Sequence, residues 1–252
     1  IVIRNSGWPK FQGIQFREMI RQIRVGLPIM LIPLMFQLVK GVDQVMIVTF
    51  LNPKDLGYYG LALSIQQAMY LIPATLGYTL VPYLVEEYAR KDNSAAETSH
   101  MFEKPTLLIS LACAFSLMMI YVFIHLPVKY YLTQYLPGLP VLYILILGIF
   151  CLGLIMIAGN FIVMCGKAKS MLKWQAVAVM LSIITNFVAI KAGYGIIGVA
   201  TATFITYFIY SSGILFLAFS LYIENNLKII NEIAKLYIPF FYLGSLLILV
   251  SA

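Results

Sequence analysis

Long apolar runs separated by short polar connections dominate the chain. At about 1.5 Å per residue, roughly 20 helical residues cross the hydrocarbon core of a bilayer. Six runs are long enough to cross or nearly so, and a seventh stops at the last residue. They span residues 25–50, 57–85, 105–125, 139–164, 174–190 and 196–222, and then 237–252. The pattern predicts an all-α, polytopic membrane helix bundle with six full transmembrane helices and a partial seventh.

The composition supports a bilayer as the surrounding solvent. Hydrophobic residues make up 62% of the 252 residues and charged residues 11%, whereas soluble domains carry about 25% charged residues. The net charge of +7 would suggest nucleic acid in a soluble protein. Here the cations lie in the connections, so we interpret them as determinants of membrane topology and expect no nucleic-acid partner.

The cations are distributed unequally between alternate connections. Of the 17 Lys and Arg residues, 13 fall on one side of the predicted topology and three on the other, and Lys40 lies within a span. The richer side holds Arg4, Lys10, Arg17, Arg21, Arg24, Arg90, Lys91, Lys104, Lys167, Lys169, Lys173, Lys228 and Lys235; the other holds Lys54, Lys129 and Lys191. Cytoplasmic loops are the ones enriched in cations. The N-terminus of the chain is therefore predicted to be cytoplasmic.

We expect three segments along the chain. Residues 1–24 form an amphipathic, cytoplasmic lead-in, and residues 25–222 form a six-helix transmembrane lobe. Residues 223–252 form a cytoplasmic connector and a truncated additional transmembrane helix. The chain begins without Met and its last apolar run is short, so we expect a piece of a longer protein.

Two charged residues lie within the first apolar run. Lys40 and Asp43 are three residues apart, on adjacent parts of one helix face and close enough to pair. Ionised groups at membrane depth cost about 2.5–3.5 kcal/mol each on insertion, and they usually face a bundle interior or a wet cavity. Gln37 and Gln44 fall with them within about 120° of the helical wheel.

The second run carries its own polar stripe. On a helical wheel its members fall within about 60°, with Gln67 beside them; they are Tyr59, Gln66, Tyr70, Pro73 and Gly77. We expect both stripes to face one hydrated cavity. A helix–helix contact sealed by hydrogen bonds and one salt bridge is the alternative that the sequence leaves open.

Catalytic and metal-binding motifs are absent from the sequence. The three cysteines and two histidines have no ligand spacing typical of a metal site. Nucleophile motifs, phosphate loops and Rossmann glycines are missing as well. We therefore predict that the protein is not an enzyme and holds no cofactor. Asn160 and Asn186 are expected to form hydrogen bonds between helices.

Three groups of residues resemble, in order and spacing, the polysaccharide-transporter branch of the multidrug/oligosaccharidyl-lipid/polysaccharide (MOP) exporter superfamily. They are GLP at 26–28, GVDQVMI at 41–47 and LGYYG at 56–60; LVPYL at 80–84 and EYARKD at 87–92; and GN at 159–160, GKAK at 166–169, Asn186 and GYGIIGVATAT at 193–203. The resemblance covers roughly residues 14–222. This segment resembles the second, C-terminal lobe of such an exporter.

The resemblance implies a function and partners. It implies two six-helix lobes around a central cavity, with the N-terminal lobe missing from this chain. It also implies flipping of an undecaprenyl-pyrophosphate-linked oligosaccharide across the bacterial cytoplasmic (inner) membrane, for O-antigen, capsule or exopolysaccharide synthesis. The expected partners are the lipid-linked oligosaccharide, the bilayer and the missing lobe.

On this hypothesis each polar residue has a role. Lys40 attracts the pyrophosphate as a point charge, and Asp43 either holds Lys40 in place or accepts a coupling Na⁺ or H⁺. Hydrogen bonds to sugar come from Gln37, Gln44, Gln66, Gln67 and Tyr70. The alternatives are a multidrug/cation antiporter of the same fold, a lipid II flippase, a membrane-embedded glycan polymerase, ligase or glycosyltransferase, and a scaffold without transport activity.

Overall fold

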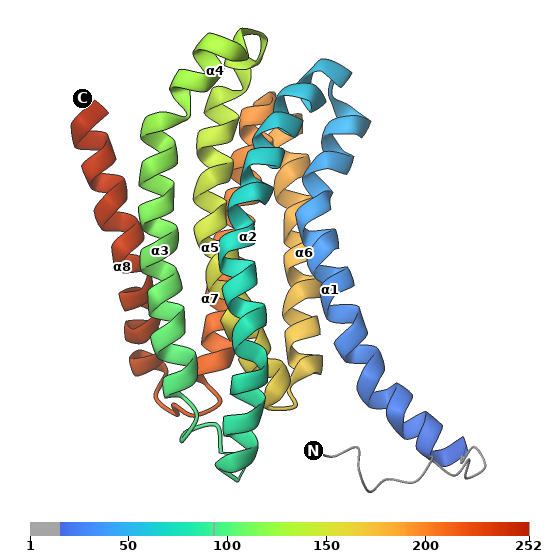
Figure 1. Ribbon diagram of the computed structural model, residues 1–252. Coiled ribbons are helices and arrows are strands. Elements are labelled where there is room, and N and C mark those ends of the chain that lie inside the picture. Colours follow the sequence, from blue (N-terminus) through green and yellow to red (C-terminus); the bar gives the residue numbers. More distant parts are fainter. Residues whose placement is uncertain (1–15, 93, 252) are drawn as a thin grey trace, which may run out of the picture.

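The computed structural model describes residues 16–92 and 94–251, and this part of the chain is helical without strands. The helices are α1 (Phe16–Phe50), α2 (Pro53–Arg90), α3 (His100–Phe123), α4 (His125–Tyr131), the short 3₁₀ helix η2 (Thr133–Gly138), α5 (Leu139–Met164), α6 (Ala168–Lys191), α7 (Gly195–Phe219) and α8 (Asn226–Ser251). Figure 1 shows them as a bundle of roughly parallel and antiparallel rods.

Six segments of the described chain are long and apolar enough to cross a membrane. They are Gln22–Phe50, Pro53–Arg90, Ala95–Tyr131, Thr133–Met164, Ala168–Lys191 and Gly195–Phe219. The predicted all-α bundle, with six helical segments long and apolar enough to cross a membrane, is thus confirmed. The third segment includes both α3 and α4, and the expected partial span 237–252 falls within α8, whose side chains beyond Tyr242 lie outside the described ones.

Two expected boundaries do not coincide with helix ends. Helix α1 begins at Phe16 and runs without a break into the first span, so its turns up to Arg24 belong to the same helix. Helix α8 begins at Asn226, inside the predicted connector. A change from basic to apolar residues alters what a helix is buried against, but it does not end the helix. Residues 1–15 of the expected lead-in lie outside the described part.

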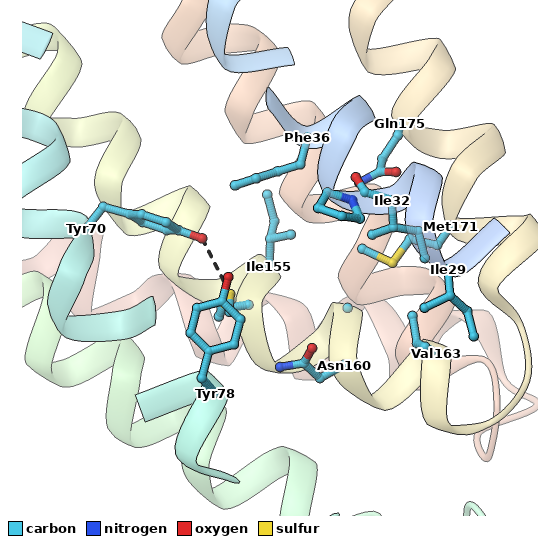
Figure 2. Close-up of a pocket in the computed structure, with 13 residues that line it drawn as sticks. Ile29, Ile32, Phe36, Tyr70, Tyr78, Ile155, Asn160, Val163, Met171 and Gln175 are labelled. Carbon is cyan, nitrogen blue, oxygen red and sulfur yellow. Dashed lines mark hydrogen bonds between the residues drawn. The ribbon is translucent and has the colours of Figure 1, made fainter. Parts of the chain in front are cut away.

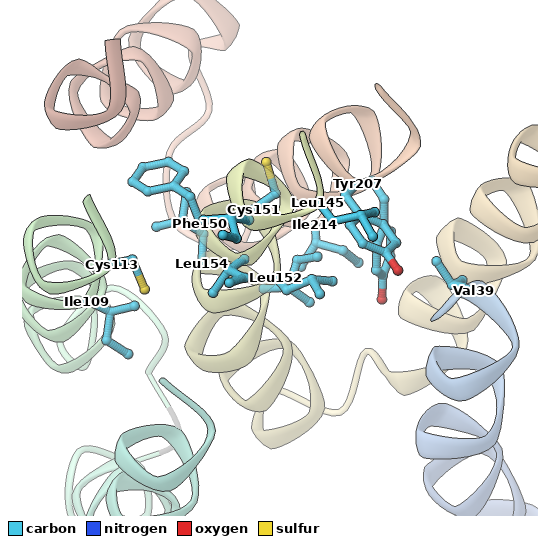
Figure 3. Packing of buried hydrophobic residues seen from close by; sticks show 14 of the residues in the cluster. Val39, Ile109, Cys113, Leu145, Phe150, Cys151, Leu152, Leu154, Tyr207 and Ile214 are labelled. Atoms are coloured by element: carbon cyan, nitrogen blue, oxygen red, sulfur yellow. The ribbon is translucent and has the colours of Figure 1, made fainter. Parts of the chain in front are cut away.

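The centre of the bundle is α5. Most residues from Leu139 to Ile162 are buried, as expected for a helix that is apolar on most of its circumference. Helices α2, α3 and α7 pack against it, α6 packs on α7, and α8 packs on α3. Figure 3 shows Ile109 and Cys113 of α3 facing Leu154 of α5 within this core.

Helices α1 and α2 are joined by a tight turn but then follow different partners. Pro53 opens α2, and the backbone N–H of Asn52 donates to Asp55 Oδ2 at 3.3 Å in a capping box. From this turn α1 packs along α6 while α2 packs along α5. The two helices therefore diverge toward the end where α1 begins (Figure 1).

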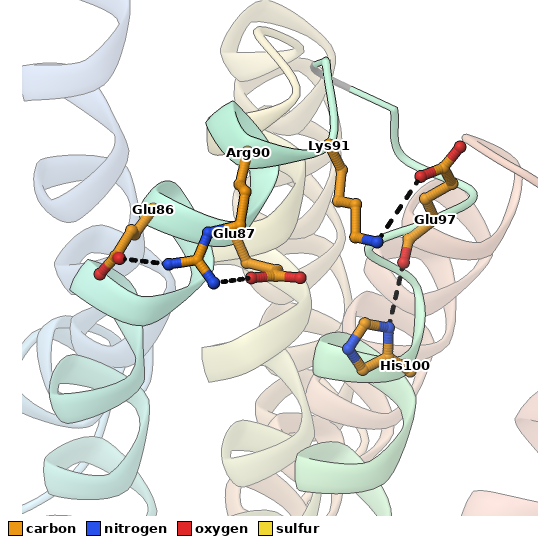
Figure 4. Close-up of polar contacts among 6 residues, drawn as sticks. All are labelled: Glu86, Glu87, Arg90, Lys91, Glu97 and His100. Carbon is orange, nitrogen blue, oxygen red and sulfur yellow. Dashed lines mark hydrogen bonds and ion pairs between the residues drawn. The ribbon is translucent and has the colours of Figure 1, made fainter.

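The connections alternate between the two ends of the bundle. Those after α2, α5 and α7 lie at the end where α1 begins, and those after α1, α4 and α6 lie at the other (Figure 1). At the first end Arg90 pairs with Glu86 at 2.7 Å and Lys91 with Glu97 at 4.0 Å (Figure 4). Such exposed pairs add at most about 1 kcal/mol. The structure thus places the cation-rich connections together, as the charge count predicts.

Candidate functional site

A polar cavity lies between α1 and α2, nearer to the turn that joins the two helices than to their other ends. Its volume is about 210 Å³, and its lining is Gln37, Lys40, Gly41 and Gln44 from α1 with Leu63, Gln66 and Gln67 from α2. Five of the residues singled out in the sequence therefore meet at one cavity, which we call the polar cleft.

Lys40 carries the positive charge of the polar cleft. Its side chain is half-buried, and its Nζ lies 4.9 Å from the ring centroid of Tyr70 and 5.7 Å from that of Phe36. These two rings contact each other with centroids 6.1 Å apart. Aromatic faces attract cations at such distances. Ion pairs among the described residues involve only Arg90, Lys91 and Lys235 as cations, so the Lys40 ammonium lacks a paired carboxylate there.

Asp43 does not face the polar cleft and does not form the expected pair with Lys40. Only 1% of it is exposed. Tyr59 OH donates to Asp43 Oδ2 at 2.6 Å, and the backbone N–H of Gln44 donates to Oδ1 at 2.8 Å. Residues three apart differ by about 60° around a helix, and here that angle separates a group at an opening from a group in the core. Asp43 consequently joins α1 to α2 by a charge-assisted hydrogen bond.

Helix α7 supplies further hydroxyls beside Asp43. Thr203 and Tyr207 both approach the carboxylate, yet neither hydroxyl has a well-formed hydrogen bond to another described residue. A Cβ on Gly148 of α5 would lie 2.9 Å from the Tyr207 ring and 3.4 Å from Gln66 Nε2. Sequence reasoning missed these α7 residues. The signal was a stripe of hydroxyls at helical spacing, at Thr203, Thr206, Tyr207 and Tyr210.

The polar stripe of α2 opens onto the cavity only in part, because Gln66 lines the polar cleft while Pro73 and Gly77 pack on α5. Gln66 Nε2 donates to the Leu145 carbonyl at 2.8 Å, so its amide serves both the contact with α5 and the edge of the polar cleft. Pro73 and Gly77 are buried against α5. A helical wheel gives the angles within one helix, but it does not say which neighbour a face meets.

Tyr70, whose ring centroid lies 4.9 Å from Lys40 Nζ of the polar cleft, lines a second cavity. This apolar pocket of about 310 Å³ lies among α1, α2, α5 and α6; its walls are Ile29, Ile32, Pro33, Phe36, Tyr70, Tyr78, Ile155, Met156, Gly159, Asn160, Val163, Met171 and Gln175. Figure 2 shows the Phe36, Tyr70 and Tyr78 rings on one side of it. Tyr70 OH donates to Met156 Sδ at 3.4 Å.

The two asparagines behave differently. Asn160 Nδ2 donates to the Gly77 carbonyl of α2 at 3.4 Å, so the expected bond between helices is confirmed. Asn186 instead donates to the Ser182 carbonyl of its own helix at 2.8 Å, and that prediction is wrong. A side chain that reaches a carbonyl one turn back satisfies its donor without a neighbour.

Comparison of the chain with family models, with curated proteins and with solved structures finds no match. Within the described residues no group of three His, Cys, Asp or Glu side chains is placed to hold a metal ion.

Proposed function

We propose that the chain is one lobe of a transporter that flips an undecaprenyl-pyrophosphate-linked oligosaccharide across the bacterial cytoplasmic membrane. The observation that supports this most directly is the polar cleft. It combines one ammonium with four glutamine amides, between two helices of membrane length. Its charge lacks a paired carboxylate among the described residues.

The polar cleft suits this substrate chemically. A pyrophosphate and its sugars must cross about 30 Å of hydrocarbon, where bare polar groups are costly. An ammonium offers a point charge to the pyrophosphate, and amides offer both donors and acceptors to sugar hydroxyls. A second lobe facing α1 and α2 would complete the cavity, and rocking of the lobes would expose it to each side in turn.

The charge of the polar cleft favours this substrate over the alternatives. A multidrug antiporter that takes cations needs an acidic cavity, whereas the residues that line this cleft include Lys40 and no carboxylate. A polymerase or ligase needs an acid or a base at the reacting atoms, and neither a carboxylate nor a histidine lines the cleft. Asp43 lies behind it, where it would accept a coupling Na⁺ or H⁺ rather than touch sugar.

Glycan export by the whole protein tests the proposal. Lys40→Ala and the double variant Lys40→Ala/Asp43→Ala should both lose export, because the pyrophosphate loses its counter-charge. Lys40→Arg should keep part of it, since the charge persists with a different geometry. Lys54→Ala, which removes an exposed lysine in the first turn of α2 and outside the lining of the polar cleft, is the matched control. Export is measured per amount of protein in the membrane.

The double variant decides between substrate binding and structure. If Lys40 serves only to balance the charge of Asp43, removing both charges together should restore export. Full activity of Lys40→Ala/Asp43→Ala would therefore contradict a role of Lys40 toward the substrate.

A further inference from the structure

We propose that the polar cleft and the apolar pocket form one binding groove for an anionic amphiphile, with its phosphate at Lys40 and the adjoining prenyl chain in the apolar pocket. This inference rests on the proposed function and adds a site for part of the lipid. Together the two cavities are called the α1–α2 groove.

Both cavities open along the same faces of the two helices. On α1 the exposed lining residues Ile29, Pro33 and Gln37 follow each other at intervals of four, and such residues share one helix face. On α2 the exposed Gln67 and Tyr78 are 11 residues apart, which is close to three turns. The lining from Ile29 to Gln37 is about 12 Å long at the helical rise of 1.5 Å per residue.

The apolar part of the α1–α2 groove offers little to a polar group. Asn160 Nδ2 donates to the Gly77 carbonyl at 3.4 Å and Gln175 Nε2 to the Ile32 carbonyl at 3.1 Å. Of these two amides, the buried Gln175 Oε1 has no hydrogen bond to a described residue. The remaining wall is mainly branched aliphatic and aromatic. Each methylene that leaves water for such a wall contributes about 0.8 kcal/mol to binding.

The Phe36–Tyr70 ring pair connects the two parts chemically. The same rings that hold the Lys40 ammonium, at 5.7 and 4.9 Å, form a wall of the apolar pocket. An anionic group bound at Lys40 therefore lies one helical turn from Phe36, which belongs to the wall of the apolar pocket. A sugar phosphate would use only the polar cleft and a hydrocarbon only the apolar pocket, whereas a prenyl phosphate uses both.

The groove also fixes the direction in which the lipid would lie. A molecule with its phosphate at Lys40 points its chain toward Ile29, which is nearer the end where α1 begins. With that end on the cytoplasmic side, as the charge asymmetry predicts, the lipid has the orientation of the outer leaflet. The α1–α2 groove would then hold the lipid after its headgroup has crossed from the inner leaflet toward the outer one.

Binding of radiolabelled geranylgeranyl phosphate to the purified whole protein in detergent tests the inference. Ile29→Trp narrows the apolar pocket at its mouth, where Ile29 is 45% exposed, so the bulk can be accommodated without unfolding. We expect about tenfold weaker binding, because methylenes of the prenyl chain can no longer be buried against the apolar pocket. Met30→Trp is the matched control: Met30 is 75% exposed and does not line the pocket, so its binding should equal that of the wild type.

A second variant and three other ligands separate the contribution of the phosphate from that of the prenyl chain. Lys40→Ala should weaken the binding of geranylgeranyl phosphate but leave the binding of the neutral geranylgeraniol unchanged. Inorganic pyrophosphate should compete poorly, because it reaches only the polar cleft. Wild-type affinity in Ile29→Trp, or competition by phosphatidylglycerol as strong as that by geranylgeranyl phosphate, would overturn the inference.

Failure of this inference differs from failure of the proposed function. If the function holds without the groove, export depends on Lys40 while Ile29→Trp binds geranylgeranyl phosphate like the wild type, which overturns the inference alone. If geranylgeranyl phosphate binds as described while export does not depend on Lys40, the inference stands and the proposed function fails.

Discussion

At the scale of single residues, the first span holds two opposite charges in two different environments. Lys40 lies at an opening, over aromatic rings, and Asp43 is buried with a hydroxyl donor. The carboxylate is stable in the core because Tyr59 and a backbone N–H replace the water that it would otherwise bind. Each charge can therefore be tested without removing the other.

Tyr59→Phe should lower the stability of the protein by about 1–3 kcal/mol, because it leaves a buried carboxylate oxygen without its donor. Tyr58→Phe is the matched control, since Tyr58 is the adjacent residue and is not bonded to Asp43. The midpoint of thermal unfolding in detergent measures both. An equal midpoint for the two variants would contradict the importance of the Tyr59–Asp43 bond.

At the scale of helices, α5 has glycines where its neighbours come closest. A Cβ on Gly153 would lie 2.9 Å from Cys113 Sγ of α3 and 3.3 Å from Pro73 Cβ of α2. Both distances are shorter than ordinary van der Waals contact, so the missing side chain lets three helices meet. Small residues serve this purpose in membrane proteins, where close packing replaces the hydrophobic effect between helices.

Gly153→Ala should destabilise the protein by about 1–3 kcal/mol through overpacking. Gly60→Ala is the matched control on α2, because a Cβ there has no neighbouring atom within 4 Å. Alanine is the better helix former by about 1 kcal/mol, so the control should be neutral or slightly stabilising. Resistance to unfolding in detergent distinguishes the two. A stable Gly153→Ala variant would show that α2 and α3 can move apart at no cost.

At the scale of the whole molecule, the helices place the cation-rich connections at one end. Lys91, Lys169 and Lys228 lie at that end, and Lys54, Lys129 and Lys191 at the other (Figure 1). The positive-inside rule then assigns the first end to the cytoplasm. The orientation is a prediction from the charges, and the structure shows only that the two groups of cations lie at opposite ends.

Cysteine labelling tests this orientation. Asn52→Cys and Lys169→Cys both replace exposed residues at opposite ends. Native Cys113 and Cys151 are buried, so only Cys165 is replaced by alanine in the background. An impermeant maleimide should label Asn52→Cys in intact spheroplasts and Lys169→Cys only after permeabilisation. Labelling of Lys169→Cys from outside would reverse the topology.

The sequence alone determined the number and order of the spans, because the thickness of the hydrocarbon sets the length of an apolar helix. It also determined that Gln37, Lys40 and Gln44 share a face, because the helical period fixes angles within one helix. The tight turn at Asn52, with a proline after it, keeps the end of α1 close in space to the start of α2. These three constraints are local, and they place three of the five polar residues of the cleft on one face of α1.

Only the tertiary structure decided what each face meets. Asp43 accepts a hydrogen bond from Tyr59 instead of pairing with Lys40. Much of the α2 stripe packs on α5, because this largely buried helix occupies the centre and its neighbours orient around it. The apolar pocket likewise depends on α1 following α6 while α2 follows α5. No periodicity within one helix contains that information, since it arises from the packing of side chains on helices far apart in the chain.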